Sequence, residues 1–248
     1  MPLMRHASEC PVVEREFALE AQSLSVDYGH RRILRSLTIA IRPGEIVELR
    51  GGNGSGKTTL LRCLAGIVRP TLGRVTWFGE PAGCCTAMRK WLGVLAHESS
   101  LYSHLTLAEN LLFVARVCGV ERPRERVAEA LHEIGLADRS QCTPPKVSRG
   151  TRQRVSIARA FLHGPRVVLL DEPFTGLDAA GRDWLVARLA RARDEGQTVC
   201  LATHEQVGSL AVCDRVFTLH DGKFTANEAT ADHPPIGVAN SKQRMPAA

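Results

Sequence analysis

A short glycine-rich segment constrains the fold of this chain more than any other feature. Residues Gly51–Thr58 read Gly-Gly-Asn-Gly-Ser-Gly-Lys-Thr and fit the pattern G-x-x-x-x-G-K-[ST] of phosphate-binding loops. They follow the apolar run Ile46–Leu49 and open the helical pattern Thr58–Leu64. This order of strand, glycine turn and helix lets backbone N–H groups and a helix N-terminus surround an anion. The segment therefore predicts a site for the phosphates of a nucleotide.

Residues of this loop have separate roles in such a site. Lys57 is expected to reach the β- and γ-phosphates, and the Thr58 hydroxyl is expected to hold Mg²⁺. We expect nucleotide contacts from Gly51, Asn53, Gly54, Ser55, Gly56, Lys57, Thr58 and Thr59. For Asn53 and Thr59, packing or helix capping remains an alternative. For the whole motif, the alternative is a glycine turn beside a surface lysine.

A second apolar run ends in two adjacent carboxylates. Val167–Leu170 is followed by Asp171, Glu172 and Pro173, and continuously apolar strands are typical of parallel sheets buried on both faces. Such sheets bind ligands at the carboxyl ends of their strands. Because successive side chains point in opposite directions, Asp171 suits the Mg²⁺ shell, whereas Glu172 can polarise the water that attacks the γ-phosphorus. A turn that merely ends a strand is the alternative.

A third apolar run places a histidine at the same edge of the predicted sheet. Thr198–Ala202 leads into Thr203 and His204. An imidazole at this position can hydrogen-bond both a phosphate oxygen and a catalytic group. We therefore expect His204 to sense the nucleotide or orient the catalytic group, with a purely structural histidine as the alternative.

The pattern of the whole chain predicts an α/β domain. Strand-like apolar runs alternate with helical patterns, and a helix-rich middle, Leu107–Leu136, interrupts them. We expect a folded domain over residues 17–225, with an inserted helical subdomain at about 98–150. Residues 1–16 lack periodicity and are expected to form a loose extension, and the polar residues 226–248 a disordered tail.

Composition excludes several other functions. The net charge of +6 is not gathered into a basic block, so we expect no nucleic acid partner. The eight cysteines form no C-x-x-C pair, which favours buried thiols in a reducing compartment; the adjacent Cys84 and Cys85 remain the one conceivable redox or metal spot.

No apolar run approaches the roughly 20 residues that span a bilayer, and Met1–Glu16 carries charges. We expect no signal peptide and no membrane span.

The order of these motifs resembles that of the ATP-binding-cassette (ABC) ATPases, from about Phe17 to Phe224. The most distinctive segment is Val147–Arg154, which is similar in register to the family signature L-S-G-G-Q-x-Q-R. The resemblance implies a phosphate-loop core with a mostly parallel sheet, an N-terminal antiparallel β subdomain and an inserted helical subdomain. It also implies ATP hydrolysis coupled to membrane transport, with ATP and Mg²⁺ bound.

The same resemblance implies partners. In the family, two copies form a head-to-tail homodimer, which would place Ser148 and Gly150 of one copy against the ATP bound by the other. Gly176–Asp178 matches the segment along that interface. Tyr28 matches the aromatic that stacks on adenine, with plain strand packing as the alternative. Membrane-spanning transporter subunits are the implied partners, and the implied location is peripheral, on the cytoplasmic face of the cell inner membrane.

Two departures from the family pattern bear on the mechanism. Arg149 replaces the first signature glycine and Thr151 the signature glutamine; the added guanidinium could strengthen capping or point outward. A glutamine that joins Mg²⁺ and water to the helical subdomain is missing from Leu92–Glu98. Ungapped alignment places His97 there, with Glu98 beside it. We expect His97 to contact the nucleotide site, where it would make the contact with bound water sensitive to pH; Glu98, which can also accept a hydrogen bond from that water, is the alternative.

A narrower resemblance concerns the transported substrate. The segments Leu95–Tyr102, Leu105–Leu111 and Ser148–Gly150 are similar to the ATPase subunit of the bacterial haem exporter of cytochrome c maturation. In that system separate membrane proteins handle haem, which fits the absence of a C-x-x-C-H motif here. The alternatives are another half-size exporter of the drug or lipid type, a soluble ABC ATPase without transport, and a small-molecule kinase, which the signature segment disfavours.

Overall fold

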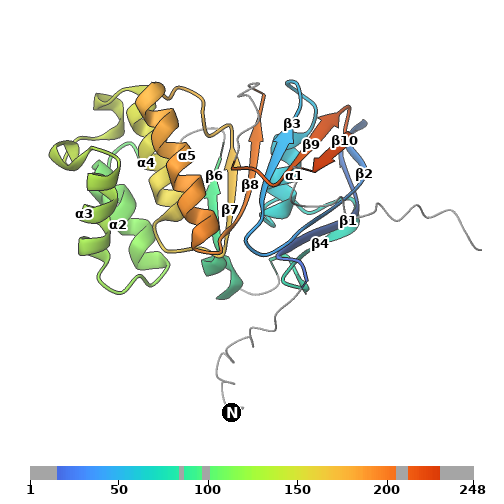
Figure 1. The fold of residues 1–248 in the computed structure, drawn as a ribbon, viewed down its shortest axis with the longest axis horizontal. Coiled ribbons are helices and arrows are strands. Elements are labelled where there is room, and N and C mark those ends of the chain that lie inside the picture. The colour runs from blue at the N-terminus through green and yellow to red at the C-terminus, as the bar shows by residue number, and fades with distance from the viewer. Residues whose placement is uncertain (1–15, 84–86, 97–100, 205–211, 230–248) are drawn as a thin grey trace, which may run out of the picture.

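Two β-sheets and two groups of helices make up the protein in the computed structural model, which describes residues 16–83, 87–96, 101–204 and 212–229 (Figure 1). The strands are β1 (Leu19–Tyr28), β2 (Arg31–Ile41), β3 (Ile46–Arg50), β4 (Leu72–Trp77), β5 (Glu80–Pro81), β6 (Leu92–Leu95), β7 (Val167–Asp171), β8 (Thr198–Thr203), β9 (Arg215–His220) and β10 (Lys223–Ala229). The helices are α1 (Lys57–Leu64), α2 (Leu107–Val117), α3 (Pro123–Glu133), α4 (Arg149–Phe161) and α5 (Ala179–Asp194), with 3₁₀ turns η1 (Ala87–Trp91), η2 (Ala137–Arg139) and η3 (Pro144–Lys146).

The larger sheet has six strands in the order β10-β9-β3-β8-β7-β6, all parallel except β10. Every residue of β7 and β8 is buried, as expected for central parallel strands covered on both faces. In register, Asp171 lies opposite Ala202, and Arg50 opposite Thr203. The carboxyl ends of β3, β7 and β8 therefore meet at one edge of the sheet.

The smaller sheet, β2-β1-β4-β5, is antiparallel. Helix α1 lies between it and one face of the larger sheet, because Leu60 and Leu64 share a core with Leu24 of β1 and Cys200 of β8. Helices α4 and α5 cover the opposite face, where Leu185 packs into a second core. The expected mostly parallel sheet and antiparallel β subdomain are both confirmed.

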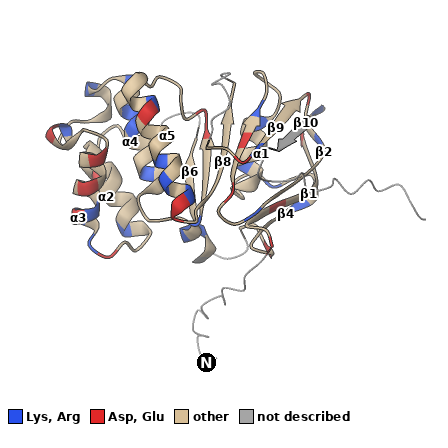
Figure 2. Cartoon of the chain, in the orientation of Figure 1, with Lys and Arg blue, Asp and Glu red and all other residues tan. Residues whose placement is uncertain are grey.

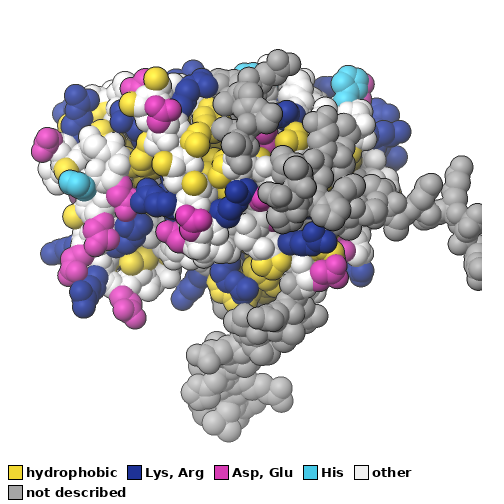
Figure 3. Space-filling view, in the orientation of Figure 1, with side chains coloured by type: hydrophobic (Ala, Val, Ile, Leu, Met, Phe, Trp, Pro, Cys, Tyr) yellow, Lys and Arg dark blue, Asp and Glu magenta, His cyan; other side chains and the backbone are white. Residues whose placement is uncertain are grey.

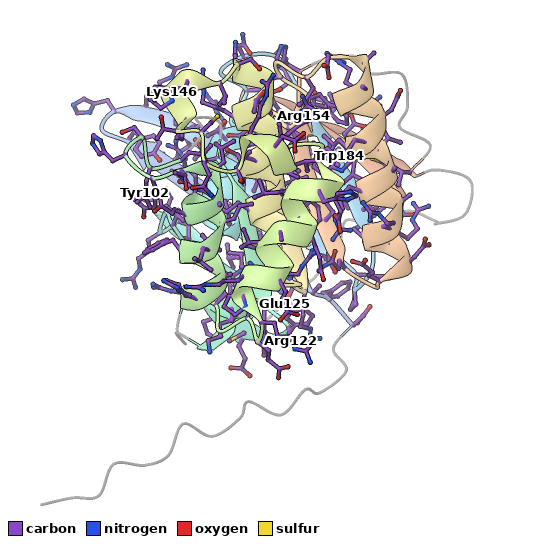
Figure 4. All side chains as sticks on the ribbon, turned by 90° about the vertical axis from the view of Figure 1, so that its left-hand side faces the viewer. Tyr102, Arg122, Glu125, Lys146, Arg154 and Trp184 are labelled. Atoms are coloured by element: carbon purple, nitrogen blue, oxygen red, sulfur yellow. The ribbon has the colours of Figure 1, made fainter. Side chains whose placement is uncertain are left out.

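A helical layer is attached beside this core (Figure 4). Helices α2, α3 and α4 share a third apolar core, which Trp184 of α5 contacts. A capping box fixes the start of α2: Thr106 Oγ1 accepts from the Glu109 N–H, and the Glu109 carboxylate accepts from the Thr106 N–H. These two hydrogen bonds fix Thr106 as the N-cap of α2.

The carboxyl-terminal boundary differs from the expected one. Strand β10 continues to Ala229, past residue 225, because residues 226–229 pair with β9. Their polar composition hides this, since an edge strand gains its pairing from its neighbour and needs little apolar pattern of its own.

Charged side chains are interspersed, and three of the five described cysteines are buried while Cys118 and Cys142 are half-buried. Lys, Arg, Asp and Glu are interspersed on the helices and over the face in Figures 2 and 3. Burial raises the pKa of the Cys63 thiol to about 11 and that of Cys213 to about 12, so both stay protonated at neutral pH. Cys84 and Cys85 lie outside the described residues.

Within the described parts of the chain, none of the helices combines the length and the apolarity that crossing a bilayer requires.

Candidate nucleotide site

The phosphate loop connects β3 to α1, as the motif predicts. The helix begins at Lys57, one residue before the expected start, with Gly56 as its N-cap at φ 109°. A Cβ atom on Gly56 would lie 2.7 Å from Leu34 Cδ2, and one on Gly51 would lie 2.3 Å from Leu219 O. Only glycine fits at these two positions, because the loop passes against the backbone and side chains of neighbouring strands.

Lys57 lies inside the loop and is 6% exposed. Its Nζ donates hydrogen bonds to Gly51 O at 2.7 Å and Gly52 O at 3.2 Å, and lies 3.7 Å from Glu172 Oε1. A surface lysine is therefore the wrong description. The ammonium group is held where an anion in the loop would meet it.

A pocket of about 320 Å³ opens over this loop. It is lined by Arg31, Ile33, Asn53, Gly54, Ser55, Gly56, Lys57, Thr58, Thr59 and Glu172. Arg31 and Ile33 come from β2 and were missed by the sequence reasoning, because only the folding of the small sheet brings them to the loop. Tyr28 does not line the pocket; it is 50% exposed at the end of β1, opposite Arg31 in the hairpin register.

Glu172 and His204 meet at the rim of this pocket. The carboxylate Oε2 lies 2.8 Å from His204 Nδ1, a distance at which an Nδ1–H donates to it, and accepts from the His204 backbone N–H at 3.3 Å. Pairing of β7 with β8 produces the contact, because the two residues follow neighbouring strands. Glu172 has φ 51°, a conformation that residues with side chains rarely adopt. Asp171, the last residue of β7, is 4% exposed.

The donor set beside the loop fits Mg²⁺ only together with phosphate. The described residues contain no cluster of three His, Cys, Asp or Glu side chains that could hold an ion alone. Mg²⁺ prefers hydroxyl and carboxylate oxygens, completed by phosphates and water. Thr58 lines the pocket and offers a hydroxyl, whereas the Asp171 carboxylate is buried at the end of β7 and is not part of the pocket lining. Within the described chain Ser55 Oγ is buried without a hydrogen-bond partner. A phosphate oxygen or ion shell in the loop would satisfy this atom.

The signature segment forms the start of α4 and does not line the pocket over the phosphate loop. Ser148 caps α4, its Oγ accepting from the Thr151 N–H at 3.1 Å. A Cβ on Gly150 would lie 2.6 Å from Gly176 O, so this glycine allows the helix to pack against the loop after β7. Neither Ser148 nor Gly150 lines the pocket over the phosphate loop. The structure thus separates them from the other predicted nucleotide contacts of the same chain.

Comparison with known proteins identifies the family. A family model described as "ABC transporter" matches residues 34–175. The chain belongs to the ABC transporter family. It is an ATPase domain of the ABC type, and its two sheets, helical layer and phosphate loop agree with that membership.

Similar proteins include both importers and exporters by name. The chain is 35% identical to the 2-aminoethylphosphonate import ATP-binding protein PhnT of Salmonella choleraesuis (strain SC-B67), over 94% of this chain and 65% of PhnT. It is also 35% identical to the macrolide export ATP-binding/permease protein MacB of the same organism, over 87% of this chain and 34% of MacB. The chain thus spans somewhat less than two thirds of the PhnT relative.

Two solved structures have the same ABC fold. One, an ATP-binding subunit of an ABC transporter, superposes with a TM-score of 0.80 at 30% identity, covering 86% of this chain and 90% of that one. The other is a dimeric post-hydrolysis state of the ATP-binding cassette MJ0796 bound to ADP and Pi. It gives a TM-score of 0.79 at 25% identity and covers 85% of this chain and 98% of that one.

One family expectation stays untested, and one residue of the signature segment makes contacts that were not expected. His97 and Glu98 lie outside the described residues, so their replacement of the usual glutamine stays a prediction. Gln153, in the signature segment, has contacts that sequence reasoning missed: its Nε2 donates to Glu172 O at 3.2 Å and Pro173 O at 3.1 Å. No local pattern signals these contacts, because the partners are far apart in the sequence.

Proposed function

We propose that this chain is the ATP-binding and ATP-hydrolysing subunit of a membrane ABC transporter. One observation carries the proposal: the Glu172 carboxylate lies between Lys57 Nζ and His204 Nδ1 at the rim of a phosphate-loop pocket. A carboxylate in this position can accept a proton from water next to a γ-phosphate. An adjacent cation and imidazole can stabilise the charge that develops there.

Each residue has one role in this proposal. Lys57 and the loop N–H groups bind the β- and γ-phosphates. Glu172 accepts the proton of the attacking water, and His204 holds the Glu172 carboxylate and faces the phosphate. Thr58 and Asp171 would hold Mg²⁺, which supplies charge neutralisation to the phosphates. Tyr28, exposed at the end of β1, would reach adenine at the outer side of the pocket.

The proposal includes a head-to-tail homodimer. Ser148 and Gly150 lie at the N-terminus of α4, which favours anions, yet they do not line the pocket of their own chain. A second copy facing the pocket would use them as a cap on its partner's nucleotide. The similar MJ0796 cassette was solved as a dimer, which supports an assembly of two copies.

Membrane-spanning subunits are the proposed partners, at the cytoplasmic face of the inner membrane. The narrower proposal for the cargo is haem export in cytochrome c maturation, supported by the segments Leu95–Tyr102, Leu105–Leu111 and Ser148–Gly150. PhnT and MacB are named for import of a phosphonate and export of a macrolide. These names give opposite directions, so a separate experiment must decide the cargo.

Membrane attachment tests the transporter assignment. We expect the chain in the membrane fraction when hydrophobic transporter subunits from its own source are co-expressed, and in the supernatant when they are left out. A soluble complex under both conditions contradicts the assignment. For the cargo, deletion of the chain from its source should remove covalently bound haem from c-type cytochromes on a haem-stained gel. Normal staining would refute haem export and favour the other functions, among them an exporter of the drug or lipid type.

A further inference from the structure

The backbone at Glu172 is held in an unfavourable conformation. Its φ of 51° is in the left-handed region, where a side chain crowds the backbone. Non-glycine residues stay there only when surrounding contacts hold them. At Glu172 the N–H donates to Ala202 O at 2.9 Å, and the C=O accepts from the Thr175 N–H at 3.2 Å. These bonds fix one side of the residue to β8 and the other to its own turn.

A third contact comes from a different part of the fold. Gln153, on the second turn of α4, directs its carboxamide N–H₂ at two successive carbonyls, Glu172 O at 3.2 Å and Pro173 O at 3.1 Å. The amide group has two N–H donors, so both bonds form together. The two hydrogen bonds from Gln153 fix the peptide group between Glu172 and Pro173. The orientation of this peptide group depends on the φ and ψ angles of Glu172.

Helix α4 is held firmly against this loop. Gly150, one turn before Gln153, packs so closely that a Cβ would lie 2.6 Å from Gly176 O. The aliphatic stem of Arg149 lies along Gly176, since a Cβ there would be 3.3 Å from Arg149 Cγ and Cδ. The carboxamide is therefore mounted on a rigid helix with little freedom to move relative to the loop.

We propose that Gln153 is a positioning residue for Glu172. Its carboxamide holds the left-handed backbone of Glu172, so that the carboxylate stays between His204 and Lys57. Gln153 does not line the pocket, and it acts only through Glu172. The proposal rests on the proposed function, in which Glu172 is the general base.

The steady-state ATPase kinetics of four purified full-length variants test this role. Gln153→Met keeps the length of the side chain and removes the donors, whereas Gln153→Lys restores donors on a stem long enough to reach both carbonyls. Gln197→Met is the matched control, because Gln197 Nε2 donates to Pro165 O at 2.8 Å at the opposite end of β7 and β8. Glu172→Gln removes the base itself.

We expect Gln153→Met to lower kcat by about 10- to 100-fold, the effect of a misplacement of about 1 Å. KM for ATP should stay within about twofold, because Lys57 and the loop N–H groups that bind the phosphates are unchanged. Gln153→Lys should recover kcat to within about fivefold of wild type, and Gln197→Met should stay within about twofold once corrected for folded fraction. Thermal unfolding of each variant supplies that correction.

The outcomes separate this inference from the proposed function. Two results would show that Gln153 has no positioning role, provided that Glu172→Gln is inactive. In the first, Gln153→Met keeps the wild-type kcat. In the second, Gln153→Met changes both kcat and KM, and Gln197→Met changes them to the same extent. If Glu172→Gln itself hydrolyses ATP at the wild-type rate, the proposed function fails first. Adding Gln153→Met to Glu172→Gln should cause no further loss, because Gln153 acts through that carboxylate.

Discussion

Glu172→Gln should lower the rate of ATP hydrolysis by about 10²- to 10⁴-fold, the usual contribution of general base catalysis. The carboxamide has the shape of the carboxylate and can still accept from His204 Nδ1–H, so the hydrogen bond of 2.8 Å need not be lost. What disappears is a group that can take a proton from water. ATP binding should therefore remain close to that of wild type.

Two measurements check this expectation: phosphate release under saturating ATP, and the dissociation constant for ATP by equilibrium titration. Glu125→Gln, an exposed pair partner of Arg122 on α3, is the control and should retain full activity. A Glu172→Gln protein that releases phosphate within about twofold of the wild-type rate would mean that another group activates the water.

Lys57→Met should weaken ATP binding by about 10- to 100-fold, which corresponds to the roughly 1.5–3 kcal/mol of a hydrogen bond to a charged group. Lys57 is the buried cation that faces the carbonyls of Gly51 and Gly52 across the loop. Methionine fills the same volume without charge. The β- and γ-phosphates then lose their point-charge partner, while the loop N–H groups remain.

Isothermal titration with ATP measures this change. Lys146→Met, at an exposed position in η3, removes the same charge far from the pocket and controls for net charge. Because Lys57 also bonds the loop carbonyls, thermal unfolding without nucleotide must show that the variant is folded. Unchanged affinity in a folded Lys57→Met protein would place the phosphates away from this loop.

The parts of the site that sequence predicted are those encoded by local pattern. The phosphate loop combines a glycine spacing with an apolar strand before it and a helix after it, and these determine the local conformation. The buried strands β7 and β8 are continuously apolar, so the positions of Asp171, Glu172 and His204 at one edge followed from parallel pairing. The helix start at Lys57 was off by one residue, which is within the ordinary fraying of helix ends.

The parts that sequence could not predict depend on distant segments. Arg31 and Ile33 reach the pocket only because the small antiparallel sheet folds over α1. The bonds from Gln153 to the Glu172 loop join α4 to the end of β7, and the left-handed φ of Glu172 has no local signature, since glycine is the residue that usually occupies this region. Residues 226–229 of β10 were assigned to the tail because their composition is polar, whereas in the fold they pair with β9.

A mixing experiment tests most directly the central claim, that ATP is hydrolysed at a site shared between two chains. Lys57→Met disables the phosphate loop, and Ser148→Arg disables the cap, so each variant alone should hydrolyse ATP poorly. In a head-to-tail heterodimer of the two, one site combines an intact Lys57 with an intact Ser148 from the other chain. We predict that the mixture releases phosphate well above the sum of the separate variants. A mixture no more active than that sum would contradict the shared site.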